Sequence, residues 1–172
     1  KCPDVLSPLE RRIIVKKLDP LPHQHVYFSF ICYDDIHPFF PNDYTQHPSK
    51  DYYFREHYSV LLVTGIANPT PLIYHIKPYV NEFLHIKFRD HHWYTSKDIQ
   101  KIRKTFNKLG DEKKIILTTE KDIVRLQAGD LADEIRGLPL FYIPIRIDFH
   151  DSDINEFKKQ VIDYVERTYR NI

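Results

Sequence analysis

Three short polar motifs hold the residue types in this chain that could do chemistry. They are Gly65–Pro69, Arg89–His92 and Thr118–Asp122, and each follows a short apolar run and precedes a helical pattern. In an open α/β sheet, ligands bind outside the carboxyl ends of the parallel strands. The spacing therefore predicts three loops that converge on one edge of one sheet and form one site there.

The second motif offers the groups best suited to proton transfer, Asp90 and His91. An imidazole titrates near neutral pH, and an adjacent carboxylate can orient it or stabilise its charge. The pair His91 and His92 could also bind a metal ion. A purely structural interpretation is equally open, in which a histidine caps the next helix or packs against Trp93 and Tyr94.

The third motif would open a helix with Glu120, Lys121 and Asp122 in its first turn. Free backbone N–H groups and the positive end of the helix dipole favour an anion there, and Lys121 would add a charge, so phosphate could bind. Spacing alone favours a plainer interpretation. Thr119 and Asp122 form a capping pattern, and Glu120 and Lys121 would then belong to a solvated first turn.

The first motif supplies small residues and an amide, through Gly65 and Asn68. They would let the backbone approach a ligand or another domain closely, although a tight strand-to-helix turn needs the same residues. The chain contains no G-x-x-x-x-G-K-[ST] sequence, and its four glycines stand at positions 65, 110, 129 and 137. This chain alone therefore cannot cradle a triphosphate in that way.

Composition indicates a globular protein of one domain or slightly more. The chain has 172 residues, of which 42% are hydrophobic and 14% aromatic, enough to bury a core. Its 25 basic and 24 acidic residues nearly balance, so overall charge gives no case for nucleic-acid binding. No apolar run approaches the roughly 18 residues of a membrane span, which argues against integral insertion.

Two further features concern the origin of the chain. Cys2 and Cys32 are too far apart in sequence for a metal pair and do not form a disulfide framework, which favours a reducing, cytosolic setting. The chain has no methionine, and Lys1–Pro3 looks more like the end of a strand than a terminus. We therefore expect a fragment of a longer protein.

Hydrophobic periodicity predicts the elements that position the motifs. We expect an α/β fold, with a Rossmann-like, mostly parallel sheet of about four strands flanked by helices. The expected strands are 60–63, 86–88, 115–117 and 140–147. Helices should follow Thr70, Thr95, Thr119 and Asp153, the first with Val80 and Phe83 on its apolar side and the second ending at Gly110.

The first sixty residues differ from this pattern. Ser7, Pro8 and Glu10 predict a capped helix that buries Leu9, Ile13 and residues 15–18. Residues 20–59 are rich in aromatics and interrupted by prolines, which predicts a β-ribbon or connector that includes residues 51–54. The last helix should bury a face formed by Ile154, Phe157, Val161, Tyr164 or Val165, and Thr168.

The motifs taken together carry a family resemblance. Lys1–Pro3, Thr64–Pro69, Arg89–Tyr94 and Thr118–Asp122 resemble, in order and spacing, the C-terminal half of the tetraacyldisaccharide 4'-kinases, the lipid A 4'-kinases. The resemblance covers almost the whole chain. Each motif alone is unspecific, whereas the ordered set is hard to obtain by chance.

The resemblance implies an ATP- and Mg²⁺-dependent transfer of the γ-phosphate to the 4'-hydroxyl of a lipid A disaccharide 1-phosphate. It also implies a peripheral protein at the cytoplasmic face of a Gram-negative inner membrane, with no nucleic-acid partner. An N-terminal P-loop lobe would bind ATP and Mg²⁺ and make the membrane contact. In this chain, 1–19 would be the tail of that lobe, 20–59 the ribbon connector and 60–172 the C-terminal α/β lobe.

The resemblance also assigns roles to residues. His91 and Asp90 match the family's catalytic pair, in which the histidine acts with a carboxylate of the P-loop lobe to activate the sugar hydroxyl. Glu120, Lys121 and Asp122 match a second motif that gives structural support or phosphate contact, and Gly65 and Asn68 would lie near substrate or phosphate. Lys1 matches a lysine near the nucleotide. The N-K-x-D spacing of nucleotide-binding lysines is absent, however, because Asp4 stands three residues after Lys1. The resemblance implies no metal ligand in this chain.

Two other functions remain open from the residues. One is a metal-dependent phosphoesterase of the aspartate-histidine-histidine type, which would use His91 and His92 to activate water. The other is a non-catalytic module whose strand-end loops dock another domain. On the kinase interpretation, this chain by itself is expected to be inactive.

Overall fold

The computed structural model of the chain describes residues 2–40, 49–127, 129–151 and 153–169. They divide into two compact units, one formed by residues 1–33 with 145–172 and the other by residues 34–144. This division differs from the boundaries drawn on the sequence, because the last helix belongs with the start of the chain rather than with residues 60–144.

The unit of residues 34–144 is built on a five-stranded sheet. Its strands are β2 (His37–Pro38), β6 (Leu140–Ile143), β5 (Lys114–Thr119), β3 (Ser59–Thr64) and β4 (Phe83–Lys87), in that spatial order. The four strands from β6 to β4 are parallel, and β2 pairs antiparallel at the edge. The predicted mostly parallel α/β sheet is confirmed.

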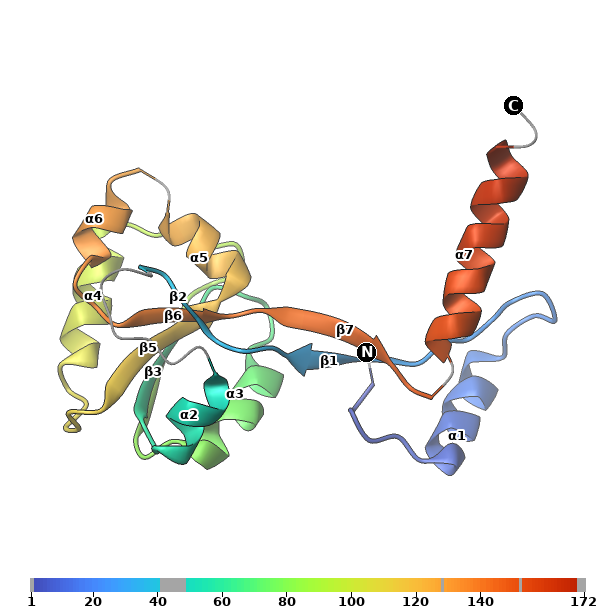
Figure 1. Ribbon diagram of the computed structural model, residues 1–172, viewed down its shortest axis with the longest axis horizontal. Coiled ribbons are helices and arrows are strands. Elements are labelled where there is room, and N and C mark those ends of the chain that lie inside the picture. Colours follow the sequence, from blue (N-terminus) through green and yellow to red (C-terminus); the bar gives the residue numbers. More distant parts are fainter. Residues whose placement is uncertain (1, 41–48, 128, 152, 170–172) are drawn as a thin grey trace. The chain divides into compact units, whose positions relative to one another are not determined.

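Helices cover both faces of this sheet. In Figure 1, α4 (Ser96–Phe106), α5 (Glu120–Leu126) and α6 (Leu131–Ile135) lie on one face, and α2 (Lys50–Arg55) and α3 (Thr70–Ile76) lie on the other. All six residues of β3 and five of the six in β5 are buried. Such continuous burial is what a central parallel strand requires, and it explains why these strands read as unbroken apolar runs.

The order of the strands brings the polar motifs together. The chain runs from β3 outward to β4, then crosses back over β3 to β5 and on to β6. The direction of travel therefore reverses between β3 and β5, and in Figure 1 the helices that follow these two strands lie on opposite faces of the sheet. Ligands of open α/β sheets bind outside the strand ends at such a reversal.

Several local expectations need correction. Residues 51–54 lie in helix α2, begun by a hydrogen bond from Asp51 N–H to the Ser49 hydroxyl, and are not part of a ribbon. Val80 and Phe83 lie outside the helix that should contain them, because α3 continues only as the short 3-10 turn η1 (Lys77–Tyr79) and Phe83 begins β4.

The strand expected over 140–147 is also wrong in one respect. It is divided at Pro144 into β6 and a second strand, β7 (Ile145–Phe149), and the two pair with different partners. Proline has no N–H to donate to a ladder, which suits the point where the chain leaves one sheet for another. The helix from Thr95 is confirmed, with its capping box, but it ends at Phe106, before Gly110.

The unit of residues 1–33 and 145–172 is a two-stranded ribbon with a helix at each end of the chain. Strands β1 (Ser29–Tyr33) and β7 pair antiparallel, from Ser29 opposite Phe149 to Tyr33 opposite Ile145. Helix α1 (Pro8–Leu18) begins with the predicted capping box, and α7 (Asp153–Tyr169) follows the ribbon. The ribbon therefore takes its second strand from far along the chain, not from residues 20–59.

Hydrogen bonds and ion pairs tie both helices to this ribbon. The Phe28 N–H donates to Asp153 Oδ2 at 2.8 Å, and Arg11 pairs with Asp151 at 3.0 Å. The Phe157 ring of α7 stacks on the Phe149 ring with centroids 5.2 Å apart.

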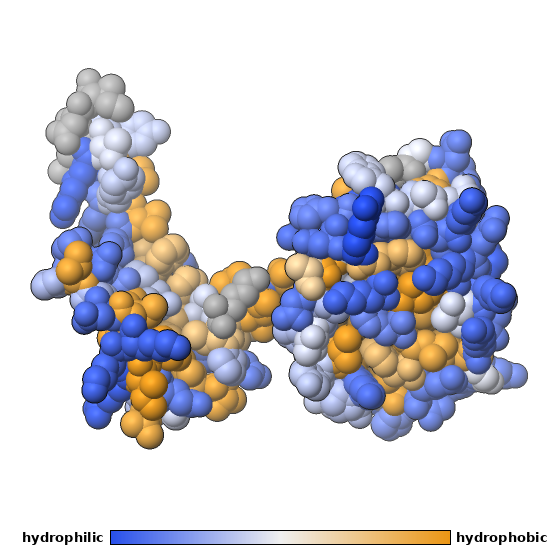
Figure 2. All heavy atoms as spheres, turned by 180° about the vertical axis from the view of Figure 1, so that it is seen from behind, coloured by the Kyte–Doolittle hydropathy of each residue, from blue (hydrophilic) through white to orange (hydrophobic). Residues whose placement is uncertain are grey.

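The predicted buried faces of α1 and α7 are nevertheless exposed. Leu9 and Ile13 of α1 are 66% and 56% exposed, and Val161 and Val165 of α7 are 45% and 43% exposed. Neither helix has a buried residue among those described, and Figure 2 shows apolar side chains on the surface of this unit. Periodicity identified an apolar face, but the sequence does not say what covers it. Among the described residues, no helix combines the length and apolar character needed to cross a bilayer.

Candidate functional site

The three motifs follow three neighbouring strands. Gly65 comes directly after β3, Asp90 and His91 follow β4, and Thr119 ends β5. The predicted convergence at one sheet edge is therefore present, and direct contacts join the loops.

Asp122 is the buried centre of these contacts, with a side chain that is 0% exposed. Its Oδ2 accepts hydrogen bonds from the Gly65 N–H at 2.9 Å and the Thr119 hydroxyl at 2.8 Å. Its own N–H donates to Thr119 Oγ1 at 3.2 Å, so the capping interpretation of this motif is right. The carboxylate is occupied by protein donors, which gives Asp122 a structural part in the site.

Gly65 lies too close to its neighbours for any side chain. A Cβ at this position would lie 2.9 Å from Asp122 Oδ1 and 3.3 Å from His92 Cβ. The Tyr94 hydroxyl would be the next atom, at 3.4 Å. Burial first, and the charge of Asp122 second, raise the pKa of the Tyr94 phenol, so it stays neutral. The glycine is therefore required for packing between the loops.

His91 stands out from this packed base. Its side chain is 78% exposed, and its backbone adopts a left-handed conformation with φ of 56°. The His91 N–H donates to the Gly65 carbonyl at 3.1 Å and to Asp90 Oδ1 at 3.0 Å. On the side chain, Nε2 lies 3.8 Å from Asp90 Oδ2. The loop thus presents an imidazole beside a carboxylate, as the sequence predicts.

Arg125 completes the site and was missed by the sequence reasoning. Its Nη1 donates to Asp122 Oδ1 at 3.2 Å and to the Gly65 carbonyl at 3.3 Å, while its Nη2 lies 3.2 Å from His91 Nδ1. Its side chain is only 16% exposed. The available signal was its position three residues after Asp122 on a helix, where opposite charges meet.

His92 has other partners than His91 and a structural role. Its Nε2 lies 3.0 Å from Asp98 Oδ2, and its ring stacks on Phe88 with centroids 4.5 Å apart. Burial acts to raise the pKa of Asp98, but hydrogen bonds from His92 and Thr95 outweigh it and lower that pKa below its ordinary value. Asp98 is therefore held as a carboxylate at the start of α4.

The two histidines consequently do not form a shared metal site. Across the part of the chain that the structure describes, no group of three or more His, Cys, Asp or Glu side chains is arranged to hold a metal ion. The Nε2 of His92 is already bonded to Asp98, and Nδ1 of His91 lies against Arg125.

The other predicted site residues are less closely integrated. The Asn68 side chain accepts a hydrogen bond from the Thr70 N–H at 3.1 Å, so it forms the turn that starts α3. Glu120 and Lys121 are exposed in the first turn of α5. Lys1 lies outside the described residues.

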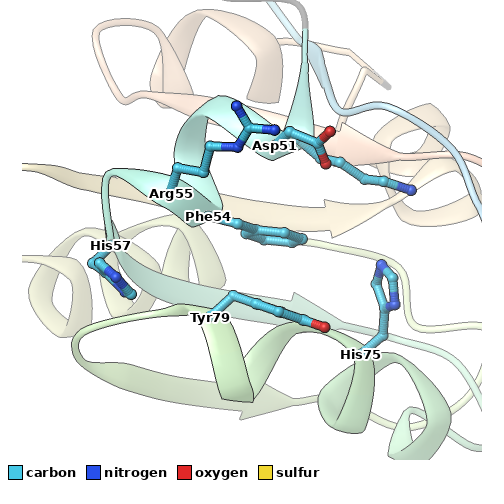
Figure 3. A pocket seen from close by; sticks show the side chains of 7 residues that line it. Asp51, Phe54, Arg55, His57, His75 and Tyr79 are labelled. Carbon is cyan, nitrogen blue, oxygen red and sulfur yellow. The ribbon is translucent and has the colours of Figure 1, made fainter.

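A separate pocket of about 530 Å³ lies elsewhere in this unit. Figure 3 shows Phe54 and Tyr79 facing each other within it, and their rings stack with centroids 5.2 Å apart. Its lining comes from α2, His57, α3 and η1, and includes none of the predicted site residues. The candidate site is therefore the exposed strand-end edge around His91, not this pocket.

Fold and site together define an open-sheet α/β protein whose strand-end loops carry an exposed Asp-His pair above a buried Asp-Arg pair. The family profile of tetraacyldisaccharide-1-P 4'-kinase matches residues 31–165. The chain belongs to this tetraacyldisaccharide 4'-kinase family.

Curated relatives agree. The chain is 36% identical to the tetraacyldisaccharide 4'-kinases of Phocaeicola vulgatus and of Bacteroides thetaiotaomicron, over 99% of this chain and 46% of each relative. It thus spans about half the length of these proteins. A solved structure described as the "apo" form of LpxK from Aquifex aeolicus in complex with ATP is 17% identical, with a TM-score of 0.40, over 78% of this chain and 35% of that one.

Proposed function

We propose that this chain is the C-terminal part of a lipid A 4'-kinase, which transfers the γ-phosphate of ATP to the 4'-hydroxyl of a lipid A disaccharide 1-phosphate. Family membership supports this reaction, and the position of His91 supports the strand-end edge of the sheet as the place where it occurs. The observation that carries the proposal is an exposed imidazole, fixed by Asp90 and Arg125, at the sheet edge where open α/β folds bind ligands.

The sequence of this chain contains no P-loop for ATP and Mg²⁺. The sequence has no phosphate-cradling glycine-rich loop, and the described residues hold no cluster of metal ligands. We propose that the nucleotide and its metal bind to a P-loop lobe in the half of the relatives that has no counterpart here. Lys1 would lie near that nucleotide.

His91 and Asp90 are the proposed catalytic residues. Phosphoryl transfer depends mainly on positioning and on stabilising charge, so an imidazole that hydrogen-bonds the reacting groups is a suitable contribution. Glu120 and Lys121, exposed on the neighbouring loop, would lie near phosphate, together with Asn68. Gly65 and Asp122 would support them from below, because both are buried in the contacts that join the loops.

The exposed faces of α1 and α7 support docking onto the P-loop lobe. Leu9, Ile13, Val161 and Val165 would each leave water if that lobe covered them. Burying a fully exposed side chain of this kind is favourable by roughly 1.5–3 kcal/mol, and these partly exposed ones would each gain a part of that. On this proposal, residues 1–19 join that lobe, residues 20–33 together with β7 form the connector, and peripheral contact with the cytoplasmic face of the inner membrane comes from the part outside this chain.

The phosphoesterase alternative loses its structural basis, because His91 and His92 point to different partners and Nε2 of His92 is bonded to Asp98. A docking module without chemistry would give a different result in the test below.

The test is ATP-dependent phosphorylation of a lipid A disaccharide 1-phosphate by the full-length protein. His91→Ala should lower turnover about a hundredfold or more, the size expected for a group acting in proton transfer or charge stabilisation. His23→Ala removes an exposed histidine that is distant in sequence from His91. It serves as the matched control and should keep wild-type turnover. Equal turnover of both variants, with equal folding by circular dichroism, would leave His91 as a structural residue and favour the docking module.

A further inference from the structure

The Arg125 guanidinium joins three groups of the site. It donates to the Asp122 carboxylate and to the Gly65 carbonyl, and it lies 3.2 Å from Nδ1 of His91. The Gly65 carbonyl also accepts the His91 backbone N–H at 3.1 Å. The backbone and the side chain of His91 are therefore both in contact with the same group of residues, Gly65, Asp122 and Arg125.

The contact between Arg125 and His91 has a definite chemical direction. A guanidinium has five N–H donors, no acceptor, and does not lose its proton in proteins. Nδ1 of His91 must therefore be the acceptor and carry the lone pair. A neutral imidazole has one ring proton, so that proton sits on Nε2.

The other side of the ring favours the same arrangement. Asp90 Oδ2 lies 3.8 Å from Nε2, so a negative charge lies on the side of the nitrogen that carries the proton. The positive charge of Arg125 faces the unprotonated nitrogen. Which ring nitrogen is protonated is set by the hydrogen bond that the other one makes.

We propose that Arg125 is a positioning residue that holds His91 in the tautomer with its proton on Nε2, so that the imidazole offers the reaction an N–H donor rather than a lone pair. Its meaning for catalysis rests on the proposed kinase function. In this arrangement the Nε2–H of His91 stabilises negative charge on the transferred phosphate or on a neighbouring carboxylate, and the proton of the sugar hydroxyl passes to a carboxylate base of the proposed P-loop lobe.

Asp122 explains why Arg125 stays in place. Its carboxylate is fixed by Gly65 and Thr119, and it holds the guanidinium at 3.2 Å with both side chains largely out of solvent. An arginine that reached His91 from solvent would lose side-chain entropy on binding, whereas this one is already ordered.

The first experiment reads the tautomer directly, in this chain labelled with ¹⁵N-histidine, by long-range ¹H–¹⁵N correlation NMR. Wild-type His91 should show a protonated Nε2 and an unprotonated Nδ1. Arg125→Met should weaken this preference toward that of a free imidazole, in which the Nε2–H tautomer already predominates, and Arg125→Lys, which keeps a donor and the charge beside Asp122, should retain more of it. Arg12→Met, at an exposed position, should leave the His91 signals unchanged.

Two results would overturn the proposal: a wild-type His91 with its proton on Nδ1, or a folded Arg125→Met with wild-type His91 signals. Should Arg125→Met not fold, the wild-type spectrum and the Arg125→Lys spectrum still decide.

The second experiment measures turnover of the full-length protein. Arg125→Met should lower kcat about tenfold, equivalent to about 1.4 kcal/mol, with partial rescue in Arg125→Lys. His91→Gln, whose amide N–H can stand at the Nε2 position, should lose less turnover than His91→Ala, whereas equal losses would mean that a lone pair is needed. A full-length protein without lipid kinase activity would refute the proposed function and leave the NMR result standing.

Discussion

The backbone N–H of Gly65 donates to Oδ2 of Asp122 over 2.9 Å, although 57 positions separate the two residues in sequence. This bond spans the point where the strand order reverses, between the loop after β3 and the helix after β5. A backbone donor and a buried carboxylate thus hold together the two loops on which His91 rests.

Gly65→Ala should destabilise the protein by about 1–3 kcal/mol, because the added methyl would meet Asp122 Oδ1 at 2.9 Å and overpack the site. Urea unfolding measures the loss. Gly110→Ala is the matched control, since a Cβ there meets no atom within 4 Å. Equal stabilities of the two variants would show that the loops can separate at little cost.

Asp122→Asn should cost about 2–4 kcal/mol of unfolding free energy, because it leaves Arg125 without its buried counter-charge and weakens the bond from Gly65. Glu120→Gln changes an exposed carboxylate in the same helical turn and should stay within about 0.5 kcal/mol of wild type. Chemical denaturation of both variants checks the difference. A loss as small for Asp122→Asn as for Glu120→Gln would contradict the structural part assigned to Asp122.

The protein should become less stable as the pH falls, because His85 takes up a proton less readily in the folded protein than in the unfolded chain. Burial, and then the charge of Lys87, lower the pKa of His85 below its ordinary 6.5, and its Nε2 lies 2.9 Å from the Thr64 hydroxyl. The unfolded chain therefore binds this proton more readily than the folded one. The contribution is fully present above about pH 6.5 and is lost as the pH falls toward and through the folded pKa.

Unfolding free energies at pH 7 and pH 5 test this effect. His85→Gln, which cannot titrate, should lose less stability between these pH values than wild type. His23→Gln, at an exposed histidine, should keep the wild-type difference. A wild-type slope in His85→Gln would assign the acid sensitivity to other groups.

Charges on the exposed apolar helix faces should act only in the full-length protein. Val165→Asp and Ile13→Asp alter side chains that are 43% and 56% exposed, so in this chain each should change stability by no more than about 0.5 kcal/mol. In the full-length protein each should lower the melting temperature by several degrees, because an unpaired charge would be buried. Thermal melts of both forms give the answer. Lys158→Asp, at an exposed polar position of α7, should change the melting temperature little in both forms. Equal shifts of the melting temperature for all three variants would argue against docking at these faces.

The sheet and its loops were predictable because their signals are local. The runs that became β3 and β5 are bounded by turn residues, and the capping boxes at Ser7 and Thr95 place the helix starts. Parallel strands bury both faces, so their loops must meet at one edge, and the expected grouping of Gly65, His91 and Asp122 followed from that rule.

Other features depend on contacts that no local pattern encodes. An arginine three residues after an aspartate is common on solvated helix faces, so nothing in the sequence distinguished Arg125 as the link to His91. Similarly, His91 and His92 are identical in type and adjacent, yet a left-handed turn at His91 sends one outward and the other onto Phe88. The partner of α1 and α7 cannot be deduced from their periodicity.

The pairing of β1 with β7 dictates an order of events during synthesis. Ser29 cannot meet Phe149 until the whole of residues 34–144 has left the ribosome. The sheet unit is contiguous in sequence and can fold as it emerges, whereas the ribbon must wait for the final stretch of chain. The unit that carries His91 would therefore be complete before the segment that links it to α7 is formed.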